Sequence, residues 1–118
     1  MKYEEDKIQM SVAKYLDLLD VLWFHPANER KTSIQQGVRL KKKGVKSGVP
    51  DVMILESNDT YKGLAIELKT AKGRLTDNQK KWLSDLQDNG FSCYVCRSFD
   101  DAKEKIDEFF KINDYGKR

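Results

Sequence analysis

GVPDVMILESNDTYKGLAIELKT, residues 48–70, is the stretch of sequence that decides the fold and contains the candidate chemistry. Two apolar runs, 51–55 and 62–69, flank the turn residues Ser57-Asn58-Asp59-Thr60. Strand-like runs separated by such residues predict an antiparallel hairpin. Pairing centred on this turn makes the numbers of opposite residues add up to about 119, with an error of a residue or two.

The second run carries an acid and a base, Glu67 and Lys69, separated by one leucine. Side chains alternate across a strand, so these two are expected on one face while Ile66 and Leu68 lie on the other. The predicted pairing puts Asp51 opposite about position 68, between the acid and the base. All three polar groups are therefore expected at one end of the hairpin.

Two carboxylates and an ammonium group on one surface can hold a divalent metal ion and activate water, as phosphodiester hydrolysis requires. Asp51 and Glu67 would supply two oxygen ligands for Mg²⁺, and the backbone carbonyl of Leu68 a third. Lys69 would hold or deprotonate the attacking water and offset negative charge in the transition state. The alternative is an exposed Glu–Lys pair, which is common on strands. The apolar surroundings and the preceding Pro50-Asp51 count against it.

Length and composition set the broader expectations. A chain of 118 residues predicts a single domain over 1–118, with 115–118 as a frayed tail. It has no run of 18 apolar residues and an acidic N-terminus without a signal-peptide core, so a cytoplasmic location without membrane contact is expected.

Cys93 and Cys96 form C-x-x-C, but on a strand they point to opposite faces. Two buried or half-buried thiols are therefore favoured over zinc binding or redox chemistry.

The remaining elements follow from periodicity, caps and breakers. They give the order α-β-α-β-β-α-β-α, an α/β fold with a mixed sheet flanked by helices. The expected elements are a helix over 5–20, a strand over 21–25, a helix over 32–43 closed by Gly44, the two hairpin strands, a helix from an N-cap at Thr76 to Gly90, a strand over 91–96 and a last helix capped by Ser98.

Positive charge is concentrated just before Asp51. Between residues 30 and 50 there are seven basic residues and no acid, beside the proposed metal site. Such a segment attracts phosphate backbones, although a lysine-rich run can also be only a solvated helix face. The predicted DNA-binding residues are Arg30, Lys31, Arg39, Lys41, Lys42, Lys43 and Lys46, with Lys72 and Arg74 in the loop after the second hairpin strand.

Pro50-Asp51 followed by Glu67-Leu68-Lys69 resembles the signature of the PD-(D/E)xK nuclease superfamily. The chain from Glu5 to about Ser98 resembles, more narrowly, the VRR-NUC (virus-type replication-repair nuclease) family. The motifs that carry this resemblance are Glu5-x-x-Ile8-Gln9, Asn28-Glu29-Arg30, Gly44-x-x-x-Gly48-Val49-Pro50-Asp51, Glu67-Leu68-Lys69-Thr70, Gly73-Arg74-Leu75-Thr76 and Gln79-x-x-Trp82-Leu83.

The resemblance implies a restriction-endonuclease-like fold and a Mg²⁺-dependent DNA endonuclease in which Mn²⁺ substitutes. It assigns the metal to Asp51 and Glu67, and catalysis to these residues and Lys69. Glu5 would point from the first helix toward the metal, and Gln79 is a further site candidate. Two alternatives stay open. A capping box already explains Gln79. The helix macrodipole favours an acid at position 5, where the neighbouring Glu4 and Asp6 compete for the role.

Single-domain members of the family, many of them from phages, resemble homodimeric Holliday junction resolvases. The resemblance therefore implies a homodimer that cuts branched DNA in a phage-infected or bacterial cell, without a nucleotide cofactor. Paired incisions in a two-fold symmetric junction need two active sites, which fits a symmetric dimer. A nuclease of the same chemistry acting on duplex or flap DNA is the main alternative, and a non-catalytic DNA-binding module is the other.

Overall fold

The computed structural model of the chain describes residues 2–27, 33–113 and 115–116. Its elements follow the expected order and alternate as predicted. They are α1 (Lys2–Leu18), β1 (Trp23–Phe24), α2 (Ile34–Lys43), β2 (Val52–Ile54), β3 (Gly63–Leu68), α3 (Asp77–Asp88), β4 (Phe91–Cys96) and α4 (Phe99–Phe110).

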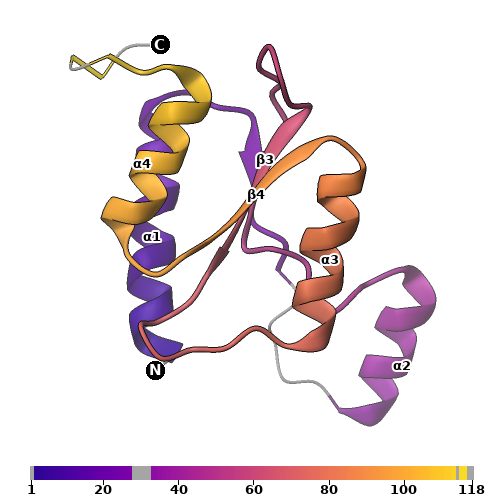
Figure 1. Ribbon diagram of the computed structural model, residues 1–118. Helices are drawn as coiled ribbons and strands as arrows, with labels where there is room; N and C mark the ends of the chain where they lie inside the picture. The colour runs from indigo at the N-terminus through magenta and orange to yellow at the C-terminus, as the bar shows by residue number, and fades with distance from the viewer. Residues whose placement is uncertain (1, 28–32, 114, 117–118) are drawn as a thin grey trace.

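The four strands form one mixed sheet in the order β1-β2-β3-β4. The first three strands pair antiparallel, whereas β4 runs parallel to β3 and is reached through α3. Parallel neighbours need such a crossover connection. In Figure 1, α1 and α4 lie side by side on one face of the sheet and α3 covers the other. The predicted α/β class, a mixed sheet flanked by helices, is confirmed.

The hairpin register differs from the expected one by one residue. Val52 pairs with Ile66 and Ile54 with Leu64, so the numbers of opposite residues add up to 118 rather than 119. Continued by one residue, this register brings Asp51 opposite Glu67. The strands are joined by a loop built on Asn58, whose Oδ1 accepts hydrogen bonds from the backbone N–H groups of Thr60 and Tyr61.

The predicted bounds of the first helix, the first strand and the basic helix need correction, and the first helix begins at Lys2 rather than residue 5. The first helix ends at Leu18 rather than residue 20, because Asp20 adopts a left-handed conformation with φ of 55°. The first strand is only Trp23–Phe24 rather than 21–25. The basic helix begins at Ile34, after an N-cap at Ser33, and ends as expected at Gly44 in the left-handed region. Residues 28–32, and 117–118 of the predicted tail, lie outside the described residues.

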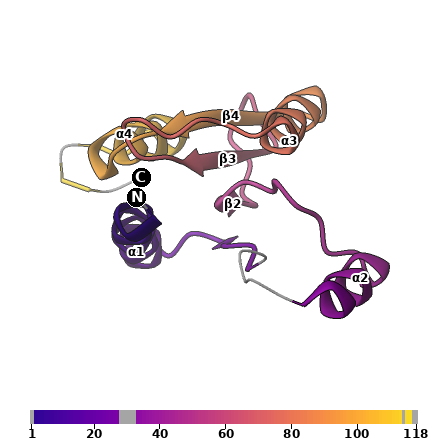
Figure 2. The same cartoon turned by 90° about the horizontal axis from the view of Figure 1, so that it is seen from below.

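The core lies between the sheet and the α1/α4 pair. It combines Val12 and Leu16 of α1 with Ile106 of α4, and with Ile66 and Leu68 of β3. The apolar face predicted for β3 is therefore the core face, which leaves Glu67 on the side of α3. Helix α2 stands away from these layers (Figure 2), and none of its residues is buried. No helix in the described part of the chain is long and apolar enough to cross a membrane.

Candidate functional site

Asp51 lies directly before β2 and directly after the buried Pro50. Its Oδ2 accepts a hydrogen bond from the backbone N–H of Leu68 at 2.7 Å. This contact holds the carboxylate at the end of β3, next to Glu67 and within one residue of the position that the sequence predicted. Leu68 itself contributes its side chain to the core, so only its backbone faces this chemistry.

Glu67 is almost completely buried, with 3% of its surface exposed. Its Oε2 lies 3.9 Å from Lys69 Nζ, and Lys69 is itself only 9% exposed. Oε1 of Glu67 is also buried, and within the described residues it has no hydrogen-bond partner. A buried carboxylate oxygen without a partner is costly unless a ligand satisfies it. The exposed Glu–Lys pair of the alternative interpretation is therefore not what the structure contains.

The environment of Glu67 favours its neutral form. Burial is the main cause, the nearby Asp51 carboxylate adds to it, and together they raise the pKa of Glu67 from 4.5 to about 9 despite the opposing charge of Lys69. The charge of Glu5 contributes in the same direction as Asp51. A carboxylate whose pKa is raised by burial and by a like charge is typical of functional sites.

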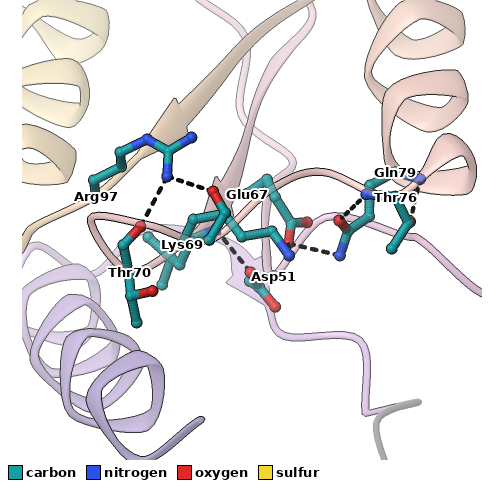
Figure 3. Close-up of polar contacts among 9 residues, drawn as sticks. Asp51, Glu67, Lys69, Thr70, Thr76, Gln79 and Arg97 are labelled. Atoms are coloured by element: carbon teal, nitrogen blue, oxygen red, sulfur yellow. Dashed lines mark hydrogen bonds and ion pairs between the residues drawn. The ribbon is translucent and has the colours of Figure 1, made fainter. Parts of the chain in front are cut away.

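Gln79 both caps a helix and contacts a proposed site residue. It is the third residue of α3, and its Oε1 accepts a hydrogen bond from the backbone N–H of Thr76 at 2.9 Å in a capping box. Its Nε2 donates to Glu67 Oε2 at 3.1 Å. Figure 3 shows this amide between the helix start and the carboxylate. The capping bond orients the amide so that its NH₂ group faces Glu67.

The loop before Asp51 packs against the start of α3. Gly48 adopts a φ of 86°, and a Cβ atom at this position would lie 2.7 Å from the backbone carbon of Asn78 and 2.8 Å from the backbone nitrogen of Gln79. Asn78 also donates a hydrogen bond to Ser47 Oγ at 2.6 Å. A glycine is therefore required where the chain turns toward Asp51, and this close contact fixes Asp51 relative to Gln79.

Glu5 approaches the site from α1. It is half-buried, whereas Glu4 and Asp6 are exposed. A cavity of about 230 Å³ is lined by Glu5, Asp6, Gln9, Met10, His25, Asp51 and Leu68. The structure thus favours Glu5 over Glu4 as the acid that shares a cavity with Asp51. Gln9, one helical turn further along, lines the same cavity.

Two residues that contact this region had no signal in the sequence. His25 Nδ1 lies 2.6 Å from the backbone oxygen of Asp51. Arg97, directly after β4, donates from Nη1 to the carbonyl oxygens of Thr70 at 2.8 Å and Gly73 at 2.7 Å. Arg97 thereby fixes the loop that follows Lys69 (Figure 3). Both act on backbone oxygens far away in the sequence, which no local pattern can reveal.

The predicted DNA-binding residues lie on two exposed segments. Lys72 and Arg74 are exposed in the loop after β3. The exposed basic residues on and after α2 are Arg39, Lys41, Lys42, Lys43 and Lys46. Arg30 and Lys31, like Asn28 and Glu29 of the family motif, lie outside the described residues.

The two cysteines have the predicted environment. Cys96 is buried, Cys93 is half-buried, and both are free thiols. Burial raises the pKa of Cys93 to about 11 and that of Cys96 to about 12. At neutral pH both side chains are therefore protonated and weakly nucleophilic.

The donor set fits a hard divalent cation better than a transition metal. Asp51 and Glu67 supply carboxylate oxygens, and one of them is the buried Oε1 of Glu67 described above. Across the described ranges, no three His, Cys, Asp or Glu side chains form a cluster that could hold a metal ion. Glu5 is therefore a more distant member than the pair. The arrangement can bind a cation at two carboxylates and place an ammonium group beside them.

Comparisons with known proteins bear on the family and the fold. The family model described as the VRR-NUC domain matches residues 3–100. A solved structure described as a VRR_NUC domain protein covers 94% of this chain and 91% of its own, with a TM-score of 0.77 and 26% identity. The Fanconi-associated nuclease 1 homolog of Arabidopsis thaliana is 37% identical over 54 residues, which make up 43% of this chain but only 6% of that protein. The chain thus corresponds to a small part of that relative.

Proposed function

Because the chain belongs to the VRR-NUC family of nuclease domains, we propose that it hydrolyses phosphodiester bonds in branched DNA at a site made of Asp51, Glu67 and Lys69, with Mg²⁺ as cofactor. Membership of the family supports a nuclease with DNA as its substrate. The observation that carries the site assignment is the convergence of the three groups: the Asp51 carboxylate on the Leu68 N–H, and Lys69 Nζ 3.9 Å from Glu67 Oε2.

The residues of the proposed site have different roles. Asp51 and Glu67 would hold the cation, and Mn²⁺ would substitute for Mg²⁺. When bound, such an ion polarises the phosphate and lowers the pKa of a coordinated water. Gln79 fixes the direction of the Glu67 carboxylate through the 3.1 Å hydrogen bond from its Nε2. The Lys69 ammonium stabilises the negative charge that develops on the phosphate. Glu5, across the cavity, would support the cation from α1.

The exposed basic residues on α2 supply the second part of the proposal. Helix α2 stands away from the sheet but leads through Lys46 to the segment that ends at Asp51, so a DNA backbone that follows this segment would contact both α2 and the carboxylates. Lysines that contact phosphates bind by charge and do not specify sequence. This suits a nuclease that selects the shape of its substrate. A four-way junction has two-fold symmetry, so we propose that a homodimer places one site on each of two strands.

Cleavage of a set of DNA substrates tests the proposal. The protein is incubated with a four-way junction, a flap and a linear duplex, each with Mg²⁺ and with a chelator, and its mass in solution is measured alongside. We expect the junction to be cut fastest, only with metal, by a dimer. Equal cutting of the linear duplex would remove the junction selectivity and leave a duplex nuclease. Binding without cutting under any metal would instead indicate a non-catalytic module.

Substitution of Lys69 tests the active-site assignment separately from DNA binding. Replacement by Ala, and by Met as a chain of similar length, is expected to lower the cleavage rate on the order of 100-fold or more. Junction affinity and circular dichroism should stay close to those of the unmodified protein. Unchanged cleavage in both variants would show that the site lies elsewhere.

A further inference from the structure

His25 contacts the backbone of a proposed metal ligand. It is the only histidine in the chain, and its ring Nδ1 lies 2.6 Å from the backbone oxygen of Asp51. A carbonyl oxygen can only accept a hydrogen bond, so Nδ1 must carry the proton and donate. This geometry fixes the tautomer of the ring, with the proton on Nδ1 rather than on Nε2 when the ring is neutral.

The end of β1 explains why a side chain makes this contact. Strand β1 pairs with β2 through Trp23 with Ile54 and Phe24 with Met53. Continued by two residues, the same register would bring Pro26 opposite Asp51. Proline has no N–H and cannot donate to a neighbouring strand, so the ladder stops. The ring of His25, one residue earlier, supplies the donor that the backbone of Pro26 lacks.

His25 also belongs to the cavity at the site. Together with Glu5, Gln9, Asp51 and Leu68 it lines the space of about 230 Å³. Asp51 is thus held at two points: its carboxylate by the Leu68 N–H at 2.7 Å and its carbonyl by the His25 ring at 2.6 Å. One contact comes from β3 and the other from the end of β1. Together they determine the direction in which the carboxylate faces.

We propose that His25 is a positioning residue of the nuclease site, which fixes the peptide of Asp51 through its Nδ1–H and thereby holds the carboxylate in its metal-binding orientation. This inference rests on the proposed function, because it treats Asp51 as a ligand of the divalent cation. Removal of a group that orients a metal ligand typically lowers metal affinity by about 10- to 100-fold.

The first test measures the tautomer in the unmodified protein. Because the chain has one histidine, the two ring nitrogens give a single pair of ¹⁵N signals without assignment by mutation. The tautomer is taken from spectra in which the two ¹⁵N shifts show a neutral ring. We expect the proton on Nδ1. A proton on Nε2 would overturn the proposal, whatever the activity of the protein.

The second test uses two amides of different length. Asn at position 25 places an N–H near the position of Nδ1, whereas Gln places it near that of Nε2. The affinity for Mn²⁺ is measured by calorimetry, next to thermal melting without metal and cleavage of the junction. We expect His25→Asn to bind Mn²⁺ within about threefold of the unmodified protein, and His25→Gln to bind at least about tenfold more weakly. The reverse order, or no loss in either variant, would contradict a role through Nδ1–H.

The Asp51→Asn variant distinguishes a failure of this proposal from a failure of the function on which it rests. If that variant keeps full Mn²⁺ affinity, Asp51 is not a ligand and the proposed metal site is wrong, whereas the tautomer still reports on the His25–Asp51 contact. If Asp51→Asn loses Mn²⁺ affinity and His25→Gln does not, the metal site stands and the positioning role of His25 is wrong.

Discussion

Gln79 Nε2 donates a hydrogen bond to Glu67 Oε2 at 3.1 Å, from a side chain whose Oε1 also caps α3. Gln79→Glu separates these two tasks. A Glu at this position of a capping box caps a helix as well as Gln does, so the start of α3 should persist. The new carboxylate would, however, replace the amide donor by an acceptor and add negative charge beside Glu67 and Asp51. We expect about 1–3 kcal/mol of lost stability at pH 8, and cleavage slower by about tenfold or more.

Thr76→Ala is the matched control for the helix cap. It removes the hydroxyl that accepts from Gln79 N–H at 3.1 Å, and should cost about 1 kcal/mol. It leaves the amide of Gln79 able to reach Glu67. Urea unfolding and junction cleavage are measured for both variants. If the Gln79→Glu and Thr76→Ala variants cleave the junction at the same rate, the contact between Gln79 and Glu67 does not contribute to cleavage.

The raised pKa of Glu67 predicts how stability depends on pH without metal. The pKa of this carboxyl is 4.5 when unperturbed and about 9 in the folded protein, so the folded state holds its proton more tightly. Stability from this group is complete below about pH 4.5 and is lost as pH rises toward 9. Glu67→Gln keeps a neutral side chain at every pH. We therefore expect the variant to be more stable than the unmodified protein at pH 8, by at least about 1 kcal/mol.

The measured quantity is the difference in free energy of unfolding between the two proteins at about pH 5 and pH 8, with a chelator present. Mg²⁺ should stabilise the unmodified protein at the higher pH, because binding favours the ionised carboxylate, and should have a smaller effect on the variant. Glu4→Gln, which replaces an exposed carboxylate on α1, is the control. A difference that does not change with pH would mean that Glu67 is ionised in the metal-free protein.

The sequence was sufficient for the relations that are local or periodic. Alternation along β3 predicted that Glu67 and Lys69 share one face, and the caps at Thr76 and Ser98 predicted two helix starts. Hairpin arithmetic predicted the place of Asp51 to within one residue. The remaining error arose because the loop between β2 and β3 is longer than a tight turn, and its closure depends on the side chain of Asn58.

The parts of the site that the sequence did not predict depend on tertiary contacts to backbone oxygens. The ring of His25 reaches Asp51, 26 residues away, and Arg97 reaches Thr70, 27 residues away. Neither contact has a characteristic spacing or residue pair. The preference for Glu5 over Glu4 likewise required the position of α1 beside the sheet, since helical periodicity and the macrodipole treat these neighbours alike.

Gly48 and Gly44 provide a pair of Ala variants that differ in the space available for a Cβ atom. Both have positive φ, 86° and 103°, but a Cβ at Gly44 meets nothing within 4 Å, whereas one at Gly48 would lie 2.7 Å from the backbone of Asn78. Ala at either position should cost about 1–2 kcal/mol for the left-handed conformation. Gly48→Ala should cost more and also slow cleavage, because the loop must move away from α3 and carry Asp51 with it. Urea unfolding and cleavage give both quantities. Equal losses in the two variants would show that the close contact does not position Asp51.

The three lysines at 41–43 test whether α2 binds DNA. They are exposed in the last turn of a helix without buried residues, so replacing all three by Ala, the best helix former, should leave the fold intact. We expect weaker junction binding, and a plot of log affinity against log salt concentration that is less steep by about 0.9 for each phosphate that the variant no longer neutralises. The cleavage rate at saturating DNA should stay within about threefold, because these residues do not form part of the proposed metal site.

A control with the same change in net charge decides whether position matters. Lys14 on α1 and Lys80 and Lys81 on α3 are also exposed, and replacing these three by Ala removes the same charge from other surfaces. If α2 lies along the DNA backbone, only the 41–43 variant should lose the steep salt dependence. If both variants weaken binding equally, DNA responds to the overall charge of the protein and α2 plays no specific part in binding. A loss of cleavage at saturating DNA in the 41–43 variant alone would instead mean that α2 orients the substrate at Asp51.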